Sequence, residues 1–97
     1  MSNINFAKAL ADETRQKIMK VCCCRQLSVS EIVAQIDVTQ PTVSHHLKVL
    51  RDAGLVSTVR RGKEIYYSLN QKQVATACCA VAGAFAPDVA LEIVKDK

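Results

Sequence analysis

VTQPTVSHHLKVLRDAGL, from Val38 to Leu55, is the stretch from which the fold of this 97-residue chain can be worked out. Its pattern predicts one helix with a defined start and a sharp end. Thr39 stands at the N-cap position, where a hydroxyl accepts a hydrogen bond from a free backbone N–H of the first turn. Pro41 fits that turn because its missing N–H is not needed there. Gly54 fits the left-handed position just past the helix end.

The two faces of this predicted helix differ in chemistry. Apolar residues recur at helical spacing on one face, which predicts a stripe that faces a core: Val43, Leu47 and Leu50. The other face has hydrogen-bonding side chains at its leading end and basic residues behind them, as on a helix that meets base edges and phosphates. An ordinary solvated helix face has a similar composition. This polar face comprises Gln40, Thr42, Ser44, His45, Lys48 and Arg51.

The segment before this helix predicts a partner for it. Ser28 and Glu31 have the spacing of a capping box, which predicts a helix over SVSEIVAQI, residues 28–36. A tight turn at Asp37 and Val38 then leads into the polar-faced helix. Two short helices joined in this way are typical of a helix-turn-helix.

The segment after Gly54 changes from helical to strand-like patterning. Residues 55–60 and 64–69 are rich in residues that favour strands, and Gly62 supplies a turn between them. A hairpin with a cationic tip directly after a recognition helix is typical of a wing. Charges at the tip of a solvated hairpin also occur as protection against aggregation. The basic residues at this tip are Arg60, Arg61 and Lys63.

Two helices are predicted before the helix-turn-helix. Residues 4–10 suggest a short first helix, and Asp12 is a predicted N-cap for a second one that runs to Cys23 or Cys24. Arg25 and Gln26 form the break that follows.

The last predicted helix has an apolar surface almost all the way round. Asn70 is its predicted cap, the helix extends to about Phe85, and Pro87 ends it; residues 88–97 are expected to form a short further helix. A helix this apolar on a small domain should not face water. We therefore expect it to pack against its twin in a homodimer.

Length and composition predict a single domain over residues 1–97, mainly α with a small β-hairpin. The helix-turn-helix spans about 28–54, the wing 55–69 and the dimerisation helix 70–86. The net charge of +4 is mildly basic, which suits a nucleic-acid partner. The sequence contains neither a membrane-spanning run nor a secretory signal pattern, so a cytoplasmic location is expected, where thiols stay reduced. The five cysteines are then candidates for metal binding or reactivity rather than for a disulfide framework.

Three motifs together resemble the ArsR/SmtB family of dimeric winged-helix repressors. FAKALADETRQKIM (6–19) is similar to that family's opening segment, LSVSEIVAQIDVTQPTVSHHLKVLRDAGLV (27–56) to its helix-turn-helix, and RRGKEIYYSL (60–69) to its wing. The resemblance implies that residues of the polar-faced helix enter the major groove of duplex DNA and that the wing reaches the flanking backbone or the minor groove. His46 borders the apolar stripe and is expected to be structural, with a phosphate contact as the alternative. The DNA-binding residues expected on this basis are Gln40, Thr42, Ser44, His45, Lys48, Arg60, Arg61 and Lys63.

The family releases DNA when an inducer binds, and here the cysteines predict a thiophilic one. The family's Cys-x-Cys site in the helix-turn-helix and its His/Asp zinc site in the last helix are both absent from this sequence. Thiols stand instead in two groups, and soft thiolates suit soft ions. A three-sulfur site that spans both groups points to As(III) or Sb(III), whereas four thiolates fit Cd²⁺, Pb²⁺ or Zn²⁺. The expected ligands are Cys22, Cys23, Cys24, Cys78 and Cys79.

Other interpretations of the cysteines and of the domain stay open from the sequence. One thiol from each group could form a disulfide or polysulfide bridge in a redox or persulfide sensor, which some members of the family are, and any single cysteine could be a buried hydrophobe. A thiol oxidoreductase is disfavoured because it would place C-x-x-C after a strand, so the chain is not expected to be an enzyme. A winged-helix module that binds only protein is a further alternative.

Overall fold

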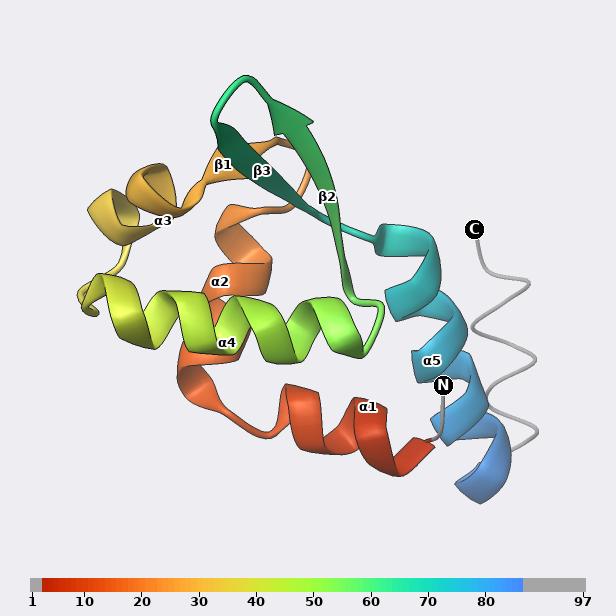
Figure 1. Cartoon of the computed structure of the whole chain (residues 1–97). Helices are drawn as coiled ribbons and strands as arrows, with labels where there is room; N and C mark the ends of the chain where they lie inside the picture. Colours follow the sequence, from red (N-terminus) through yellow and green to blue (C-terminus); the bar gives the residue numbers. More distant parts are fainter. Residues whose placement is uncertain (1–2, 87–97) are drawn as a thin grey trace.

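The computed structural model describes residues 3–86, and its elements follow the order expected for a winged helix. They are α1 (Asn3–Leu10), α2 (Glu13–Val21), β1 (Leu27–Ser28), α3 (Val29–Gln35), α4 (Gln40–Asp52), β2 (Val56–Arg61), β3 (Glu64–Leu69) and α5 (Gln71–Phe85). In Figure 1, α4 crosses the middle of the domain between the sheet and α1, and α5 stands at one end. The predicted mainly helical fold is confirmed. No helix within residues 3–86 is long and apolar enough to cross a membrane.

The core forms where the apolar stripe of α4 meets the helices on either side. Val43, Leu47 and Leu50 are at most 1 % exposed, as their spacing predicted. They pack with Ile18 of α2 and Ile32 of α3 in a single cluster of aliphatic side chains. The helix-turn-helix is therefore held by burial on one face, and the opposite face of α4 is left to solvent.

Of the predicted caps of α2, α3 and α4, the first two are formed by the expected side chains and the third is not. The Asp12 carboxylate accepts a hydrogen bond from the Arg15 N–H at 3.0 Å, which lowers the pKa of that carboxyl group. Ser28 and Glu31 form the complete capping box, with bonds of 3.2 and 2.8 Å. Thr39 is the N-cap of α4, but its hydroxyl makes no capping bond. The predicted bond is wrong because that hydroxyl pairs with the Thr42 hydroxyl at 3.0 Å.

The predicted hairpin is present, and a third strand extends it. β2 and β3 pair in antiparallel register up to Arg61 and Glu64, and Gly62 turns the chain with a φ of 62°. The two-residue strand β1 pairs with the other edge of β3, with Leu27 opposite Tyr67, so the expectation of a two-stranded hairpin was incomplete. A strand this short leaves almost no pattern in the sequence. Its pairing attaches the base of the wing to the start of α3.

The second helix ends earlier than predicted, and the end of the last helix reaches the limit of the described residues. α2 ends at Val21 with Cys22 as its C-cap, so the prediction that it runs to Cys23 or Cys24 was wrong, and Cys24 lies beyond it in a left-handed conformation. α5 begins after Asn70, whose side chain accepts from the Gln73 N–H at 3.2 Å. Pro87 and the further helix expected over 88–97 lie outside the described residues.

Candidate nucleic-acid interface and cysteine clusters

The outward face of α4 presents the predicted DNA-binding side chains to solvent. Gln40, Ser44, His45 and Lys48 are exposed, and Thr42 is half-buried against Thr39. These side chains are free of the core because the buried stripe occupies the opposite side of the helix. The first turn of α4 lacks a side-chain acceptor for its backbone N–H groups, so those donors stay available at the same end of the helix.

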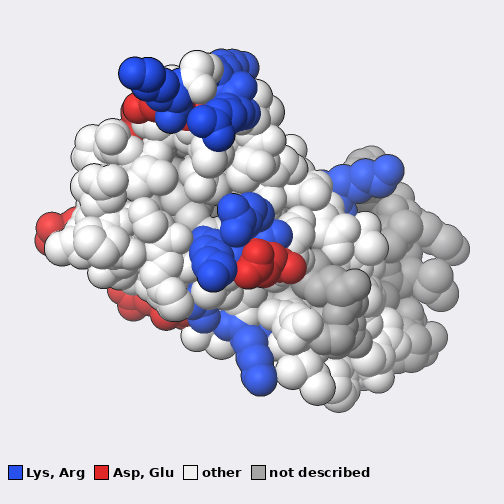
Figure 2. Space-filling model, viewed as in Figure 1, with Lys and Arg blue, Asp and Glu red and all other residues white. Residues whose placement is uncertain are grey.

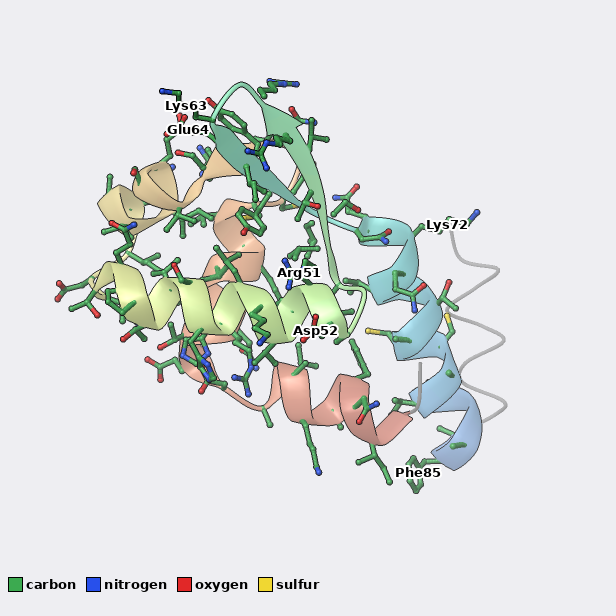
Figure 3. All side chains as sticks on the ribbon, in the orientation of Figure 1. Arg51, Asp52, Lys63, Glu64, Lys72 and Phe85 are labelled. Carbon is green, nitrogen blue, oxygen red and sulfur yellow. The ribbon has the colours of Figure 1, made fainter. Side chains whose placement is uncertain are left out.

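The tip of the wing carries three exposed basic residues with different local contacts. The Arg61 guanidinium donates to the Gln26 side chain and lies 5.5 Å from the centre of the Tyr66 ring. Arg60 donates from Nε to the Gly62 carbonyl at 3.4 Å, while Lys63 projects from the turn (Figure 3). Arg61 is thereby oriented by its neighbours, whereas Lys63 is exposed at the turn.

A groove joins the start of α4 to the wing. It has a volume of about 260 Å³, and its lining includes Gln40 from α4, Lys63 from the wing and Ser30 from α3. We call it the helix–wing groove. Figure 2 shows lysine and arginine gathered over the wing tip and again over the far end of α4, where an acidic side chain lies directly beside them. The fold thus brings two of the residue sets that the sequence singled out to one surface.

The two neighbouring histidines of α4 have different environments. His45 is exposed, whereas the side chain of His46 is only 13 % exposed and its Nδ1 accepts from the Arg15 guanidinium at 3.0 Å. Burial lowers the pKa of His46 and the Arg15 charge lowers it further, although the Asp12 carboxylate acts in the opposite direction. At 3.9 Å from His46 Nε2, that carboxylate is too far for a hydrogen bond. His46 is therefore a neutral acceptor within the fold, as the structural interpretation of it predicted.

Arg15 ties three helices together around this histidine. Its guanidinium also donates to the Ala9 carbonyl at 2.7 Å and to the Lys8 carbonyl at 3.0 Å. Both carbonyls lie in the last turn of α1, where a cation also interacts favourably with the helix dipole. The sequence analysis did not single out this residue, because an arginine in the first turn of a helix has no pattern that names its distant partners.

The first cysteine group divides into one core residue and one surface pair. Cys22 is completely buried, and burial raises the pKa of its thiol to about 11. Cys23 is half-buried and Cys24 exposed, and their Sγ atoms lie 3.6 Å apart. The side-chain amide of Gln71, at the start of α5, donates to both sulfurs at 3.0 and 3.4 Å. We call Cys23, Cys24 and Gln71 the thiol junction.

The second cysteine group lies further along α5. Cys78 is exposed and Cys79 half-buried. Seven residues of helix separate Cys78 from Gln71, which corresponds to roughly 10 Å along the axis. Within residues 3–86 of one chain, no three His, Cys, Asp or Glu side chains gather closely enough to hold a metal ion. Within the described residues of one chain, the two cysteine groups therefore do not form a shared metal site.

Comparisons with known proteins agree with this architecture. Residues 12–58 match the family described as "Bacterial regulatory protein, arsR family". Over 66 residues the chain is 38 % identical to the transcriptional repressor SdpR of Bacillus subtilis (strain 168). The aligned residues make up 68 % of this chain and 73 % of SdpR. This chain belongs to the ArsR family. The family consists of DNA-binding transcriptional regulators and not of enzymes.

Further relatives extend the match within the ArsR family. The chain is 41 % identical over 68 residues to the arsenical resistance operon repressor of the same Bacillus strain, covering 69 % of this chain but only 65 % of that protein. A solved structure of an ArsR-like transcriptional regulator from Rhodococcus sp. RHA1 superimposes with a TM-score of 0.79 at 26 % identity, over 96 % of this chain and 86 % of that one. The resemblance to the ArsR family seen in the sequence is confirmed.

Gln71 is the other residue that sequence reasoning missed in this ArsR-family chain. Its contact with the cysteines accompanies a left-handed conformation at Cys24 and a hydrogen bond of 3.1 Å from the Leu69 N–H to the Cys22 carbonyl. Neither contact leaves a periodic signal, since the partners are more than 45 residues apart. A glutamine directly after a predicted helix cap gave no reason to look toward α2.

Proposed function

We propose that this ArsR-family protein is a repressor that places α4 in the major groove of operator DNA and rests its wing on the adjacent backbone. The observation that carries the proposal is the helix–wing groove, where Gln40 and Lys63 line one surface. Exposed polar side chains along α4 suit the donors and acceptors of base edges. Arginine and lysine at the wing tip suit phosphates, whose neutralisation releases counterions.

The start of α4 supports a further phosphate contact. Its first-turn N–H groups have no side-chain cap, and an open helix N-terminus binds phosphate oxygens through those donors and the helix dipole. We expect one DNA phosphate at this position, next to Gln40.

The test of DNA binding starts from a duplex that the protein itself selects from a random-sequence pool. Binding to that duplex should weaken linearly on a logarithmic salt scale, with a slope of about −0.9 for each phosphate contacted. Lys72→Ala, in the first turn of α5 away from the groove, is the matched control and should leave the slope unchanged. If no duplex is selected, the module that binds only protein becomes the better interpretation.

We further propose that two copies pair through α5. In the described part of α5 only Ala77 is buried, and Phe85 is 85 % exposed at the end of the helix, as Figure 3 shows. An apolar face of this kind is typical of an interface. Pairing would set two α4 helices about one duplex turn apart, roughly 34 Å, on a palindromic operator. Sedimentation analysis of the wild type and of Phe85→Glu tests this, with a dimer expected only for the former.

The proposed inducer is a thiophilic ion, with As(III) or Sb(III) preferred. Relatives are named as repressors of arsenical and mercury resistance operons and as a cadmium resistance regulator, which supports a soft ion as effector. A three-sulfur site requires Cys78 or Cys79 to approach Cys23 and Cys24, either from the partner or after a change of shape. A site of four thiolates would instead fit Cd²⁺, Pb²⁺ or Zn²⁺. A protein of this kind acts in the cytoplasm, where its thiols stay reduced.

Arsenite provides the direct test of the inducer. It should release the wild-type protein from its selected duplex and should have no effect on a variant with all five cysteines changed to serine. X-ray absorption of the arsenite complex should report arsenic bound to sulfur. Release of the serine variant by arsenite would rule out a thiol sensor.

The proximity of Cys23 and Cys24 supports a second candidate, a thiol-based redox sensor. Sulfur atoms 3.6 Å apart are close enough to be joined by a peroxide or persulfide oxidant. In that case hydrogen peroxide would release the protein from its duplex, and dithiothreitol would restore duplex binding. Arsenite would have no effect on duplex binding by the reduced protein.

A further inference from the structure

The conformation of Cys24 makes the surface pair of cysteines unusual. Among residues 3–86, Cys24 is the one non-glycine residue with a positive φ, 67°. Adjacent residues on a regular helix point about 100° apart, which would separate their side chains. Since α2 has already ended at Val21, the backbone turns at Cys24 and the sulfurs of Cys23 and Cys24 come to 3.6 Å.

The same pair is connected to α5 in two ways. The Gln71 amide donates to both sulfurs, and the Leu69 N–H donates to the Cys22 carbonyl at 3.1 Å. The side-chain link depends on the state of the sulfurs, whereas the backbone link does not. A ligand on the sulfurs therefore acts on the side-chain link and leaves the end of α2 attached to the strand before α5.

We propose that Cys23 and Cys24 are a two-thiol chelate for trivalent arsenicals and that Gln71 is the positioning residue that transmits its occupancy to α5. This deepens the proposed function and rests on it. With an arsenical R–As(OH)₂, two S–H and two As–O bonds break, two As–S bonds form, and both protons leave with the hydroxides as two molecules of water. No electrons are transferred, so no oxidant or reductant is needed.

The two-thiol chelate does not need the other cysteines of the same chain. Cys22 is fully buried in the core beside Ile18, so an arsenical cannot reach it without opening the fold. Cys78 lies roughly 10 Å further along α5 than Gln71. A substituent on arsenic would occupy the space that the Gln71 amide now fills, and the first turn of α5 would lose its hold on α2. In the proposed dimer, that change alters how the two DNA-reading units are held.

The first experiment locates the chelate with phenylarsine oxide, which takes two sulfurs. One equivalent is added to the reduced full chain, and the remaining thiols are alkylated and mapped by mass spectrometry. Cys23 and Cys24 should be protected, while Cys78 and Cys79 are alkylated. Cys78→Ser/Cys79→Ser should still bind one equivalent, and Cys23→Ser/Cys24→Ser should not. Protection of Cys78 and Cys79 instead would overturn the proposal.

The second experiment tests Gln71 through the ratio of duplex affinities without and with phenylarsine oxide. Gln71→Ala should bind one equivalent as the wild type does, but this ratio should fall at least tenfold toward one. Lys72→Ala is the neighbouring control and should keep the wild-type ratio. An unchanged ratio in Gln71→Ala would overturn the role of Gln71.

The outcomes separate this inference from the proposed function. If arsenite still releases Cys23→Ser/Cys24→Ser from the duplex but does not release Cys78→Ser/Cys79→Ser, the proposed chelate is wrong. The proposed function, release by an inducer that binds thiols, is then still supported. If arsenite still releases the variant that lacks all five cysteines, both the chelate and the thiol-binding inducer are wrong.

Discussion

The half of the molecule that we propose to face DNA, which comprises α3, α4 and the wing, and the thiol junction are built by different rules. α3, α4 and the wing follow local signals: a capping box, an apolar stripe at helical spacing and a glycine turn. The thiol junction depends on a helix that ends early, one left-handed residue and hydrogen bonds across more than 45 positions of sequence. The surface proposed for DNA recognition is thus specified by neighbouring residues, whereas the surface proposed for inducer binding is specified by how distant segments meet.

The largest effect is expected from breaking the core beneath the DNA-facing half. Leu47 is 1 % exposed, so Leu47→Ala should lower the free energy of unfolding by about 2–5 kcal/mol through reduced burial and a cavity. Urea denaturation measures this, with the exposed Lys48→Ala as the control. A decrease below about 1 kcal/mol would contradict the central place of α4 in the core.

Removal of the charges at the wing tip should sharpen the contrast between the two regions. In Arg60→Ala/Arg61→Ala/Lys63→Ala, duplex affinity should fall at least tenfold, and the salt slope should decrease by about 0.9 for each phosphate that is no longer neutralised. Uptake of phenylarsine oxide should not change, because none of these residues touches the thiol junction. An equal decrease in duplex affinity and in uptake of phenylarsine oxide would mean that the wing and the thiol junction do not act separately.

The two predicted caps of the helix-turn-helix should differ when each hydroxyl is removed. Ser28→Ala breaks a formed capping box and should cost about 1 kcal/mol of stability. Thr39→Ala removes a hydroxyl that caps nothing, so its cost should be only a few tenths of a kcal/mol. Thermal or urea unfolding of both variants side by side makes the comparison.

The smallest expected effect is a dependence of stability on pH through His46. Its pKa is lowered in the fold from an ordinary value of 6.5, so the unfolded chain binds the proton more readily. Stability should therefore be complete above about pH 6.5 and decline as the pH falls below it toward the folded pKa. His46→Asn should reduce this decline between pH 7.5 and 5.5 in urea titrations, and His45→Asn should not.

The fold was largely predictable because its signals are local. The stripe of Val43, Leu47 and Leu50 and the cap at Ser28 concern residues within two turns of one another, and the structure bears both out. β1 was missed because two residues carry no periodicity. The cap at Thr39 was misjudged because a second hydroxyl, on Thr42, competes for its side chain.

The candidate site was predictable in residue type more than in arrangement. Exposure of the polar face of α4 follows from the same stripe, but the meeting of Gln40 and Lys63 in one groove depends on how the wing folds back. For the cysteines, adjacency in sequence did not reveal that Cys22 is buried while its two neighbours are at the surface. That division follows from the residue at which α2 ends.

The pairing of β1 with β3 has a mechanical consequence. It fastens the hairpin to the entrance of α3, and the capping box fixes α3 at the same point, so the hairpin and the helix pair are joined at the start of α3. In the proposed dimer, a signal that arrives from α5 is therefore expected to move each of these joined units as a whole. We expect the inducer to change the angle between the two units and to release both half-sites together.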